Sequence, residues 1–402
     1  KKFEARLTLK YGKQMGYDFD NYLAEIPEKS LKHDAIIATN SNDITEFLSM
    51  GVADMSFKPP IEVLTTLENE IKRGFLGYYG GIESYRREVT KWLKTKHDWE
   101  PKPEWVNTAH GLVAAIGTAL RAFTNQSDGI IIFSPVYHQF RNIIKANNRE
   151  LIESEMIKKN GRYYLDLNNL ENKMKGNEKV VILCSPHNPS GRIWTKNEQI
   201  EVAYFCKKHN LILIIDEIHN DLVNPENKHI TFPRIGEDYF QNFILMTSTT
   251  KTFNIAGGLM GNVIIPNNSL RDKFQKANFA TGETPNRFGM ILGEVAMRNG
   301  HQWLNDLLFY IEKNKKIFDN EINKLNTLVS MNIDATYLAW VDFTKTGDTE
   351  NNNFQKLKYE SKIISNRGST FGLGGDNHFR FNLATSTELV KKSTERIKSF
   401  FN

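Results

Sequence analysis

Three polar residues of this chain have the types and placement needed for imine chemistry. Lys251 lies in a hydroxyl-rich turn, Asp216 directly follows an apolar run, and Asn188 lies in the segment Ser-Pro-His-Asn-Pro. A desolvated lysine loses its proton more readily and becomes a nucleophile. A buried carboxylate can keep a proton on a pyridine nitrogen. An ammonium, a carboxylate and an amide at the ends of buried strands are what a pyridoxal phosphate site requires.

Short apolar runs rich in β-branched residues precede these side chains and predict the strands that position them. The predicted strands span 105–108, 129–135, 180–184, 211–215, 243–246 and 261–266. Uniformly apolar strands separated by helix-length segments indicate a mostly parallel sheet that helices bury on both faces. Ligands bind such sheets beyond the carboxyl ends of the strands, where Asn188, Asp216 and Lys251 fall. The predicted fold class is therefore α/β.

The remaining pattern predicts the domain organisation. Helical spacing runs from 59 to 96 with a break at Gly77-Tyr78-Tyr79-Gly80-Gly81, and a small-residue helix is predicted over 111–123. After residue 300 a long charged helix (303–325) and two apolar segments (339–343 and 379–384) predict a smaller α+β domain. The predicted division is a large cofactor-binding domain over 51–295, a small C-terminal domain over 296–402, and an N-terminal segment, 1–50, that joins the small domain.

Composition narrows the class of protein. A formal charge of +5 over 402 residues, with dispersed lysines, gives little support to nucleic-acid binding. Two cysteines, Cys184 and Cys206, cannot form a disulfide framework, which favours the reducing cytoplasm. We expect no secretory signal and no membrane span, because no apolar run approaches the ~20 residues that crossing a bilayer requires.

Several motifs, in order, give the chain a family resemblance. They are Val-Ala-Asp-Met at 52–55 with Pro-Pro at 59–60, Gly-Tyr at 77–78, Ser-Pro-His-Asn-Pro at 185–189, Asp-Glu-Ile-His at 216–219, Lys-Thr-Phe-Asn-Ile-Ala-Gly at 251–257, and Phe-Gly at 371–372 leading to Arg-Phe-Asn-Leu-Ala at 380–384. The chain resembles fold-type I pyridoxal phosphate enzymes of the class I/II aminotransferase superfamily. The Ala-Asp-Met opening, His187 and His219 make it more similar to the cystathionine β-lyase (C–S lyase) branch.

The resemblance implies a cofactor site. Lys251 would form the Schiff base, Asp216 would bind the pyridinium nitrogen, Asn188 would bind the phenolic oxygen and Tyr137 would stack on the ring. Further residues are implied around the cofactor, namely backbone N–H groups of Gly111 and Leu112 and the hydroxyl of Ser248 at the phosphate, His219, and Tyr78 from the second subunit of a homodimer. A helix N-terminus such as that at Gly111 suits an anion.

The resemblance also implies a substrate site, with Arg380 holding the α-carboxylate as a bidentate fork and Ala53 and Asn188 beside it. Two positions depart from the aminotransferase pattern. His219 stands where many aminotransferases have a tyrosine, and Leu259 where many have an arginine that neutralises the phosphate. We therefore expect this chain to retain its cofactor less firmly.

The reaction implied is α,β-elimination from an L-cysteine S-conjugate such as cystathionine, giving a thiol, pyruvate and ammonia. Lys251 would take the Cα proton as general base, and either Tyr78 or Lys251 would protonate the sulfur. The nearest alternative is an aminotransferase, which would require a keto-acid acceptor. A second alternative is a regulatory protein that keeps the cofactor fold, although the residues before Val52 show no helix-turn-helix pattern.

Several of these residues also have a purely structural explanation. Asp216 suits a helix cap, the segment Asn188-Pro189-Ser190-Gly191 suits a turn, and Arg380 suits a structural ion pair. Asp216, Glu217, His219 and Asp221 match no strong metal pattern. The Gly-Leu-Gly-Gly run at 372–375 is a weak dinucleotide signal, because it lacks a predicted strand–turn–helix context.

Overall fold

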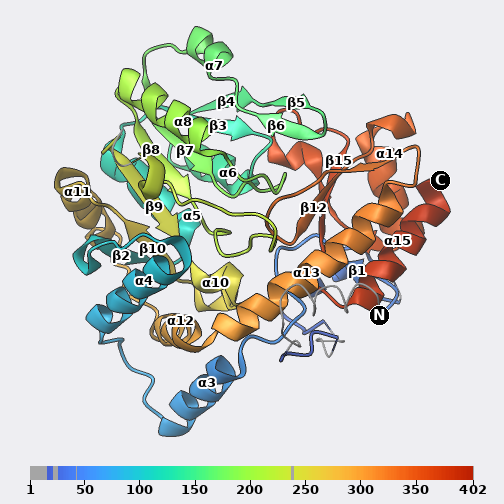
Figure 1. Cartoon of the computed structure of the whole chain (residues 1–402), viewed down its shortest axis with the longest axis horizontal. Coiled ribbons are helices and arrows are strands. Elements are labelled where there is room, and N and C mark those ends of the chain that lie inside the picture. The colour runs from blue at the N-terminus through green and yellow to red at the C-terminus, as the bar shows by residue number, and fades with distance from the viewer. Residues whose placement is uncertain (1–15, 21–25, 42, 237–239, 402) are drawn as a thin grey trace.

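The computed structural model describes residues 16–20, 26–41, 43–236 and 240–401. Figure 1 shows a large sheet with helices on both faces, and a smaller sheet beside the helices α13 and α15 on the other side of the molecule. The α/β class predicted from the sequence is confirmed. In the described part of the chain, no helix has the length and apolarity needed to cross a membrane.

The large sheet has seven strands in the order β2-β10-β9-β8-β7-β3-β4. Their bounds are β2 (Val106–Ala109), β3 (Gly129–Ser134), β4 (Glu150–Glu155), β7 (Glu178–Cys184), β8 (Ile212–Asp216), β9 (Phe243–Thr247) and β10 (Gly261–Ile264). The strands β4, β3, β7, β8 and β9 are parallel, and β10 runs antiparallel to both β9 and β2. The parallel strands therefore end at one edge of the sheet.

Alternate residues of the central strands enter two different cores, which explains why these strands are uniformly apolar. One core takes Ile131, Phe133, Val181, Leu183, Leu213 and Ile215. The other takes Ile130, Ile132, Val180, Ile182 and Ile214. The first face is covered by α4 (Ile82–His97), α8 (Lys196–Lys208) and α12 (Arg287–Asn299), and the second by α5 (Leu112–Phe123), α6 (His138–Ala146) and α11 (Asn268–Phe279).

The smaller sheet has four antiparallel strands in the order β11-β12-β15-β14. Its elements are β11 (Val329–Ser330), β12 (Leu338–Asp342), β14 (Asn366–Arg367) and β15 (His378–Asn382), and it shares a hydrophobic core with α13 (His301–Ile322) and α15 (Thr387–Phe401). Strand β1 (Leu48–Ser49) pairs in parallel with β13 (Ile363–Ile364). Residues before the large sheet therefore lie against the C-terminal part of the chain.

The remaining elements are short or peripheral. They are α2 (Leu31–Ile37), α3 (Ile61–Arg73), β5 (Ile157–Lys159), β6 (Arg162–Tyr164), α7 (Leu167–Lys173), α9 (Pro233–Gly236), α10 (Thr249–Thr252) and α14 (Glu350–Gln355). The sequence did not predict β4, because this edge strand carries three glutamates and a serine among its six residues. The antiparallel direction of β10 was also not predicted.

Candidate active site

Lys251 lies on α10, immediately beyond the carboxyl end of β9. Its Nζ donates a hydrogen bond to the carbonyl oxygen of Ala53 at 2.5 Å and lies 3.5 Å from Oδ1 of Asp54. Burial lowers the pKa of Lys251, the charge of Asp54 raises it, and the charge of Arg380 lowers it again. A larger fraction of Lys251 is therefore unprotonated near neutral pH than for a surface lysine, as a nucleophile or base requires.

Asp216 is the last residue of β8, and its side chain is buried. Burial raises the pKa of this carboxyl to about 7, the negative charge of Glu217 adds to the rise, and a backbone hydrogen bond from Ile218 opposes it. The Ile218 N–H donates to Oδ1 at 3.0 Å. A carboxyl held near its point of half-ionisation becomes fully charged once a cationic group lies beside it.

Arg380 and Asn188 meet between the two sheets. Arg380, on β15, donates from Nη1 to Oδ1 of Asn188 at 3.0 Å, and from Nη2 to the Gly51 carbonyl and to Asn366 Oδ1, both at 2.9 Å. Its Nε is buried and has no partner among the described residues. Burial lowers the pKa of Arg380 to about 10, so the guanidinium stays charged at neutral pH. These contacts join Arg380 to the segment that carries Asn188, and none of the three acceptors is a carboxylate.

Two aromatic residues and a histidine lie around these groups. Burial raises the pKa of the Tyr137 phenol, which also feels the charges of Arg380 and Asp216. Burial lowers the pKa of His219 to about 3, helped by the charges of Lys251 and Arg380, so its imidazole is neutral. His219 Nδ1 is buried without a partner in the described part of the chain. The Tyr337 hydroxyl donates to the Ala53 carbonyl at 2.9 Å, the same oxygen that Lys251 contacts.

The N-terminus of α5 has the form of an anion cradle. Gly111 precedes the helix with a φ of 88°, which favours glycine, and a Cβ added there would meet nothing within 4 Å. The Gly111 N–H donates to the Ala109 carbonyl at 2.9 Å. The predicted donor pair is thus unequal, because Gly111 uses its N–H locally, whereas Leu112 begins the helix and has no acceptor within it.

The hydroxyl of Ser248 is hydrogen-bonded within the chain. Its hydroxyl donates to the Met260 carbonyl at 2.7 Å, and its oxygen accepts the Thr250 N–H at 3.2 Å as the cap of α10. Contact with a phosphate would therefore require this O–H to turn away from Met260. Leu259 precedes Met260, has a φ of 44° and is exposed.

Tyr78 does not join the other predicted residues within one protomer. Its side chain is 87% exposed and lies in the linker between α3 and α4. Figure 1 shows this linker and α3 at the periphery, away from the seven-stranded sheet. A role for Tyr78 at this site would require a second copy of the chain.

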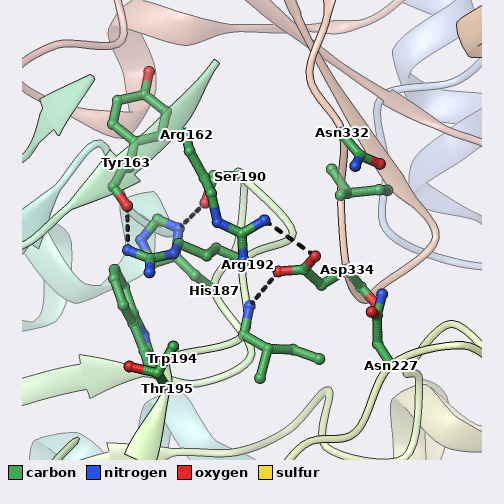
Figure 2. A network of polar contacts seen from close by, with 12 residues as sticks. Arg162, Tyr163, His187, Ser190, Arg192, Trp194, Thr195, Asn227, Asn332 and Asp334 are labelled. Carbon is green, nitrogen blue, oxygen red and sulfur yellow. Dashed lines mark hydrogen bonds and ion pairs between the residues drawn. The ribbon is translucent and has the colours of Figure 1, made fainter. Parts of the chain in front are cut away.

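The loop that carries Asn188 is held from both sides (Figure 2). His187 Nδ1 and Ser190 Oγ lie 2.7 Å apart within the loop. Asp334, from the chain that precedes β12, makes an ion pair with Arg162 and accepts the Ile193 N–H at 3.2 Å. The position of Asn188 therefore depends on a contact between segments that are distant in the sequence.

The sequence did not reveal the residues that fix segment 53–57 beside Lys251. Asn254 accepts the Met55 N–H at 3.0 Å and donates to the Phe57 carbonyl at 2.8 Å. Asn382 donates to the carbonyls of Val52 and Asp54 at 2.7 and 2.6 Å. Both asparagines lie within motifs of the family resemblance, and their place in those motifs is the sequence feature that could have pointed to them.

Asp221 is a further residue to which the sequence assigned no role, and it binds the residue that follows Lys251. Its carboxylate accepts from Thr252 Oγ1 at 2.8 Å and from Trp92 Nε1 at 3.0 Å, and lies 2.8 Å from His97 Nε2. Asp221 therefore anchors the residue that follows Lys251. Within the described ranges, no group of three or more His, Cys, Asp or Glu residues is arranged to hold a metal ion.

Comparison with known proteins identifies the family. A sequence model of the aminotransferase class I and II family matches residues 45–397. The chain belongs to this family. Cystathionine beta-lyase PatB of Bacillus subtilis is 32% identical to this chain over 359 residues, which cover 89% of this chain and 93% of PatB.

Two solved structures have the same fold as this chain. Cystalysin from Treponema denticola, described as containing pyridoxal 5'-phosphate, is 34% identical with a TM-score of 0.92 and covers 96% of this chain and 98% of its own. A putative aminotransferase from Clostridium difficile 630, described as bound to the same cofactor, is also 34% identical, with a TM-score of 0.89 and coverage of 95% and 100%.

Proposed function

We propose that this chain is a pyridoxal-phosphate-dependent C–S β-lyase, which cleaves L-cysteine S-conjugates to a thiol, pyruvate and ammonia. The observation that carries the proposal is the placement of Lys251 and Asp216 at the carboxyl edge of the large sheet, with Arg380 bonded to Asn188 at the same edge, in a chain similar to PatB over 89% of its length. The substrate class is that of the named lyase relative, carried to this chain as part of the proposal.

The residues present fit the proposed cofactor. Asp216 offers a buried carboxyl with a pKa of about 7, which a protonated ring nitrogen would turn into a carboxylate. The N-terminus of α5 offers open space at Gly111 and the N–H of Leu112, which begins the helix, to a phosphate. Asn188 would bind the phenolic oxygen through its amide, and Tyr137 would cover the ring. When bound, the cofactor supplies an electron sink that allows bonds at Cα and Cβ to break.

The other residues would bind the substrate and move its protons. Arg380, already held by Asn188 and Gly51, would bind the α-carboxylate and fix the orientation of the Cα–H bond. Lys251, whose pKa is lowered by burial, would accept the Cα proton. Loss of the thiol from Cβ and addition of water then give pyruvate and ammonia, so that atoms balance without an external acceptor.

Product analysis tests this proposal. The purified protein, supplied with pyridoxal phosphate and cystathionine or an S-alkyl cysteine, should release thiol and pyruvate in equal amounts without any added keto-acid acceptor. Lys251→Ala should abolish both products and remove the visible absorbance band that sodium borohydride bleaches in the native protein. Strict dependence of turnover on an added keto acid would contradict the lyase proposal.

An aminotransferase is the second candidate, favoured by the similarity to the putative aminotransferase of Clostridium difficile 630. Lys251, Asp216 and Arg380 would serve both reactions. The same assay separates the two activities, because a transaminase converts an added keto acid into an amino acid and leaves the C–S bond intact.

The proposal includes a homodimer in the cytoplasm. Exposed apolar side chains lie on α3, in the α3–α4 linker, after α10 and on α11, namely Ile71, Phe75, Leu76, Tyr78, Leu259 and Phe279. Burial of such side chains against a second copy would bring Tyr78 to the partner's site. Cys184 and Cys206 are both free, which supports a reducing compartment. We also propose a large domain over 51–295 and a small domain formed by 296–402 with 1–50.

A further inference from the structure

Lys32 is a buried lysine to which the proposed reaction assigns no role. It lies in the first turn of α2, and its side chain is only 8% exposed. Its Nζ donates a hydrogen bond to Ser56 Oγ at 3.0 Å. None of the described residues places a carboxylate oxygen within 4.0 Å of this ammonium. A buried ammonium with a neutral hydroxyl as its hydrogen-bond partner is costly to maintain, which calls for an explanation.

Lys32 and Lys251 are both hydrogen-bonded to the same short segment of the chain. Within residues 53–56, Ala53 accepts from Lys251, Asp54 lies 3.5 Å from Lys251, and Ser56 accepts from Lys32. The segment itself is held by Asn382, which donates to the Asp54 carbonyl at 2.6 Å. The two lysines therefore keep a fixed relation to one carboxylate.

The charges of Asp54 and Lys251 both act on Lys32. Burial lowers the pKa of Lys32 to about 8, Asp54 raises it, and Lys251 lowers it. The Lys251 pKa responds to Asp54 in the same direction and is lowered by Arg380. Near neutral pH, Lys32 is thus predominantly charged and lies within the electrostatic reach of both Asp54 and Lys251.

We propose that Lys32 is a positioning residue that keeps the nitrogen of Lys251 weakly basic. Its positive charge repels a proton on Lys251. The same charge partly cancels the attraction that the Asp54 carboxylate exerts on that proton. Both effects have the same sign, so loss of the Lys32 charge makes the Lys251 nitrogen more basic. This inference rests on the proposed role of Lys251 as cofactor-binding lysine and base.

Spectroscopic titration of the holoenzyme tests the inference. The visible absorbance of the bound cofactor changes with pH as the nitrogen of Lys251 gains or loses its proton. Lys32→Gln removes the charge but keeps a donor for Ser56, and it should raise the pH midpoint of this change by about one unit, the shift expected for charges separated by several ångströms inside a protein. Lys32→Arg should leave the midpoint near that of the native enzyme.

Lys58→Met is the matched control. Lys58 lies two residues after Ser56, is exposed, and its removal changes the net charge by the same amount. Its midpoint should not move. An unchanged midpoint in Lys32→Gln, or an equal shift in Lys58→Met, would overturn the inference.

A second measurement does not depend on cofactor binding or turnover. In the cofactor-free protein, the rate at which trinitrobenzenesulfonate labels Lys251, followed by peptide mass spectrometry, reports the fraction of unprotonated amine at each pH. Below pH 8, where Lys32 carries its proton, Lys251 should be labelled more slowly in both Lys32→Gln and Lys32→Met than in the native protein, and an equal rate would overturn the inference. Slower labelling in a chain without lyase activity would reject the proposed reaction while supporting the role of Lys32.

Discussion

Arg380 Nη1 lies 3.0 Å from Asn188 Oδ1, and this hydrogen bond joins a strand of the four-stranded sheet to the loop that follows β7 of the seven-stranded sheet. The same guanidinium is fixed by the Gly51 carbonyl and by Asn366. Arg380 is therefore oriented before any substrate arrives, and less entropy remains to be lost on binding.

Replacement of this residue by lysine should impair substrate binding. Arg380→Lys keeps one positive charge but loses the planar group that contacts Asn188, Gly51 and Asn366 at once. It also loses the buried Nε–H, which has no partner among the described residues. A lost charged hydrogen bond is worth about 1.5–3 kcal/mol, so kcat/KM should fall about tenfold to a hundredfold. Steady-state kinetics with an S-alkyl cysteine measure the effect. Arg367→Lys, a neighbouring arginine paired with Glu350, is the control and should leave kcat/KM unchanged.

Asp216 should make the stability of the cofactor-free protein depend on pH. Its folded-state pKa of about 7 lies above the value of about 3.9 in an unfolded chain. The folded protein thus binds this proton more tightly, and the stability contributed is fully present below pH 4 and is lost as pH rises through 7. The Tm of the cofactor-free protein should fall over this range relative to that of Asp216→Asn.

Pyridoxal phosphate should remove this dependence, because a protonated ring nitrogen beside Asp216 stabilises the carboxylate. The rise in Tm on adding the cofactor should therefore grow between pH 4 and pH 7 in the native protein and remain nearly constant in Asp216→Asn. Parallel curves for the two proteins would show that Asp216 does not face the ring nitrogen. Thermal melts followed by circular dichroism provide the measurement.

The strands could be predicted where burial on both faces requires an uninterrupted run of apolar residues. The central strands are apolar on both faces, and residues such as Ile131 and Ile132 enter opposite cores, so their positions were correctly predicted. Strand β4 was missed because an edge strand is only partly buried and carries glutamates. The direction of β10 was missed because composition records burial and does not record which neighbour a strand pairs with.

The site could be predicted only where it follows directly from a strand. Asp216 ends β8 and Lys251 follows β9, so the rule for ligand sites in parallel sheets places both. Lys32, Tyr337 and Asp334 belong to segments far away in the chain. Their contacts depend on how the smaller sheet and α2 meet the large sheet, and this cannot be read from a local pattern.

Gly191 should be sensitive to any side chain. It has a φ of 64°, and an added Cβ would lie 2.4 Å from Cβ of Ile333. Gly191→Ala should lower the free energy of unfolding by about 2–4 kcal/mol, combining backbone strain with the clash. Gly161→Ala is the matched control, since Gly161 has a φ of 69° with nothing within 4 Å and should cost only about 1 kcal/mol. Urea denaturation of both variants measures the difference.

Gly191→Ala should also raise KM at a temperature at which the variant remains folded, because both the Asp334 and the Ala335 N–H donate to the Gly191 carbonyl next to the Asn188 loop. Equal unfolding free energies for the two glycine variants would show that the loop yields to the added methyl group without cost.

Leu259 should limit cofactor retention. It precedes Met260, whose carbonyl accepts from Ser248, and it carries no charge for the phosphate. Leu259→Arg keeps the same backbone position and adds a guanidinium, which should lower the dissociation constant of pyridoxal phosphate about tenfold or more. Dialysis against phosphate buffer, with the retained absorbance as readout, compares the two proteins. Leu259→Lys should give a smaller gain, and equal retention in all three would place this residue away from the phosphate.

Tyr78 and Lys251 should complement each other only across two subunits. If Tyr78 completes the partner's site, Tyr78→Ala and Lys251→Ala are each inactive as homodimers. Mixing equal amounts under conditions that allow subunit exchange makes half of the dimers hybrid, and each hybrid contains one site with both native side chains. About a quarter of the native activity should then return.

The same mixture separates this arrangement from one within a single chain. If Tyr78 acted in its own protomer, each hybrid would contain one site without Lys251 and one without Tyr78, and no activity would return. Sedimentation of the mixture with a fluorescent label on one variant reports the fraction of hybrid dimers. A mixture that exchanges subunits fully yet stays inactive would remove Tyr78 from the partner's site.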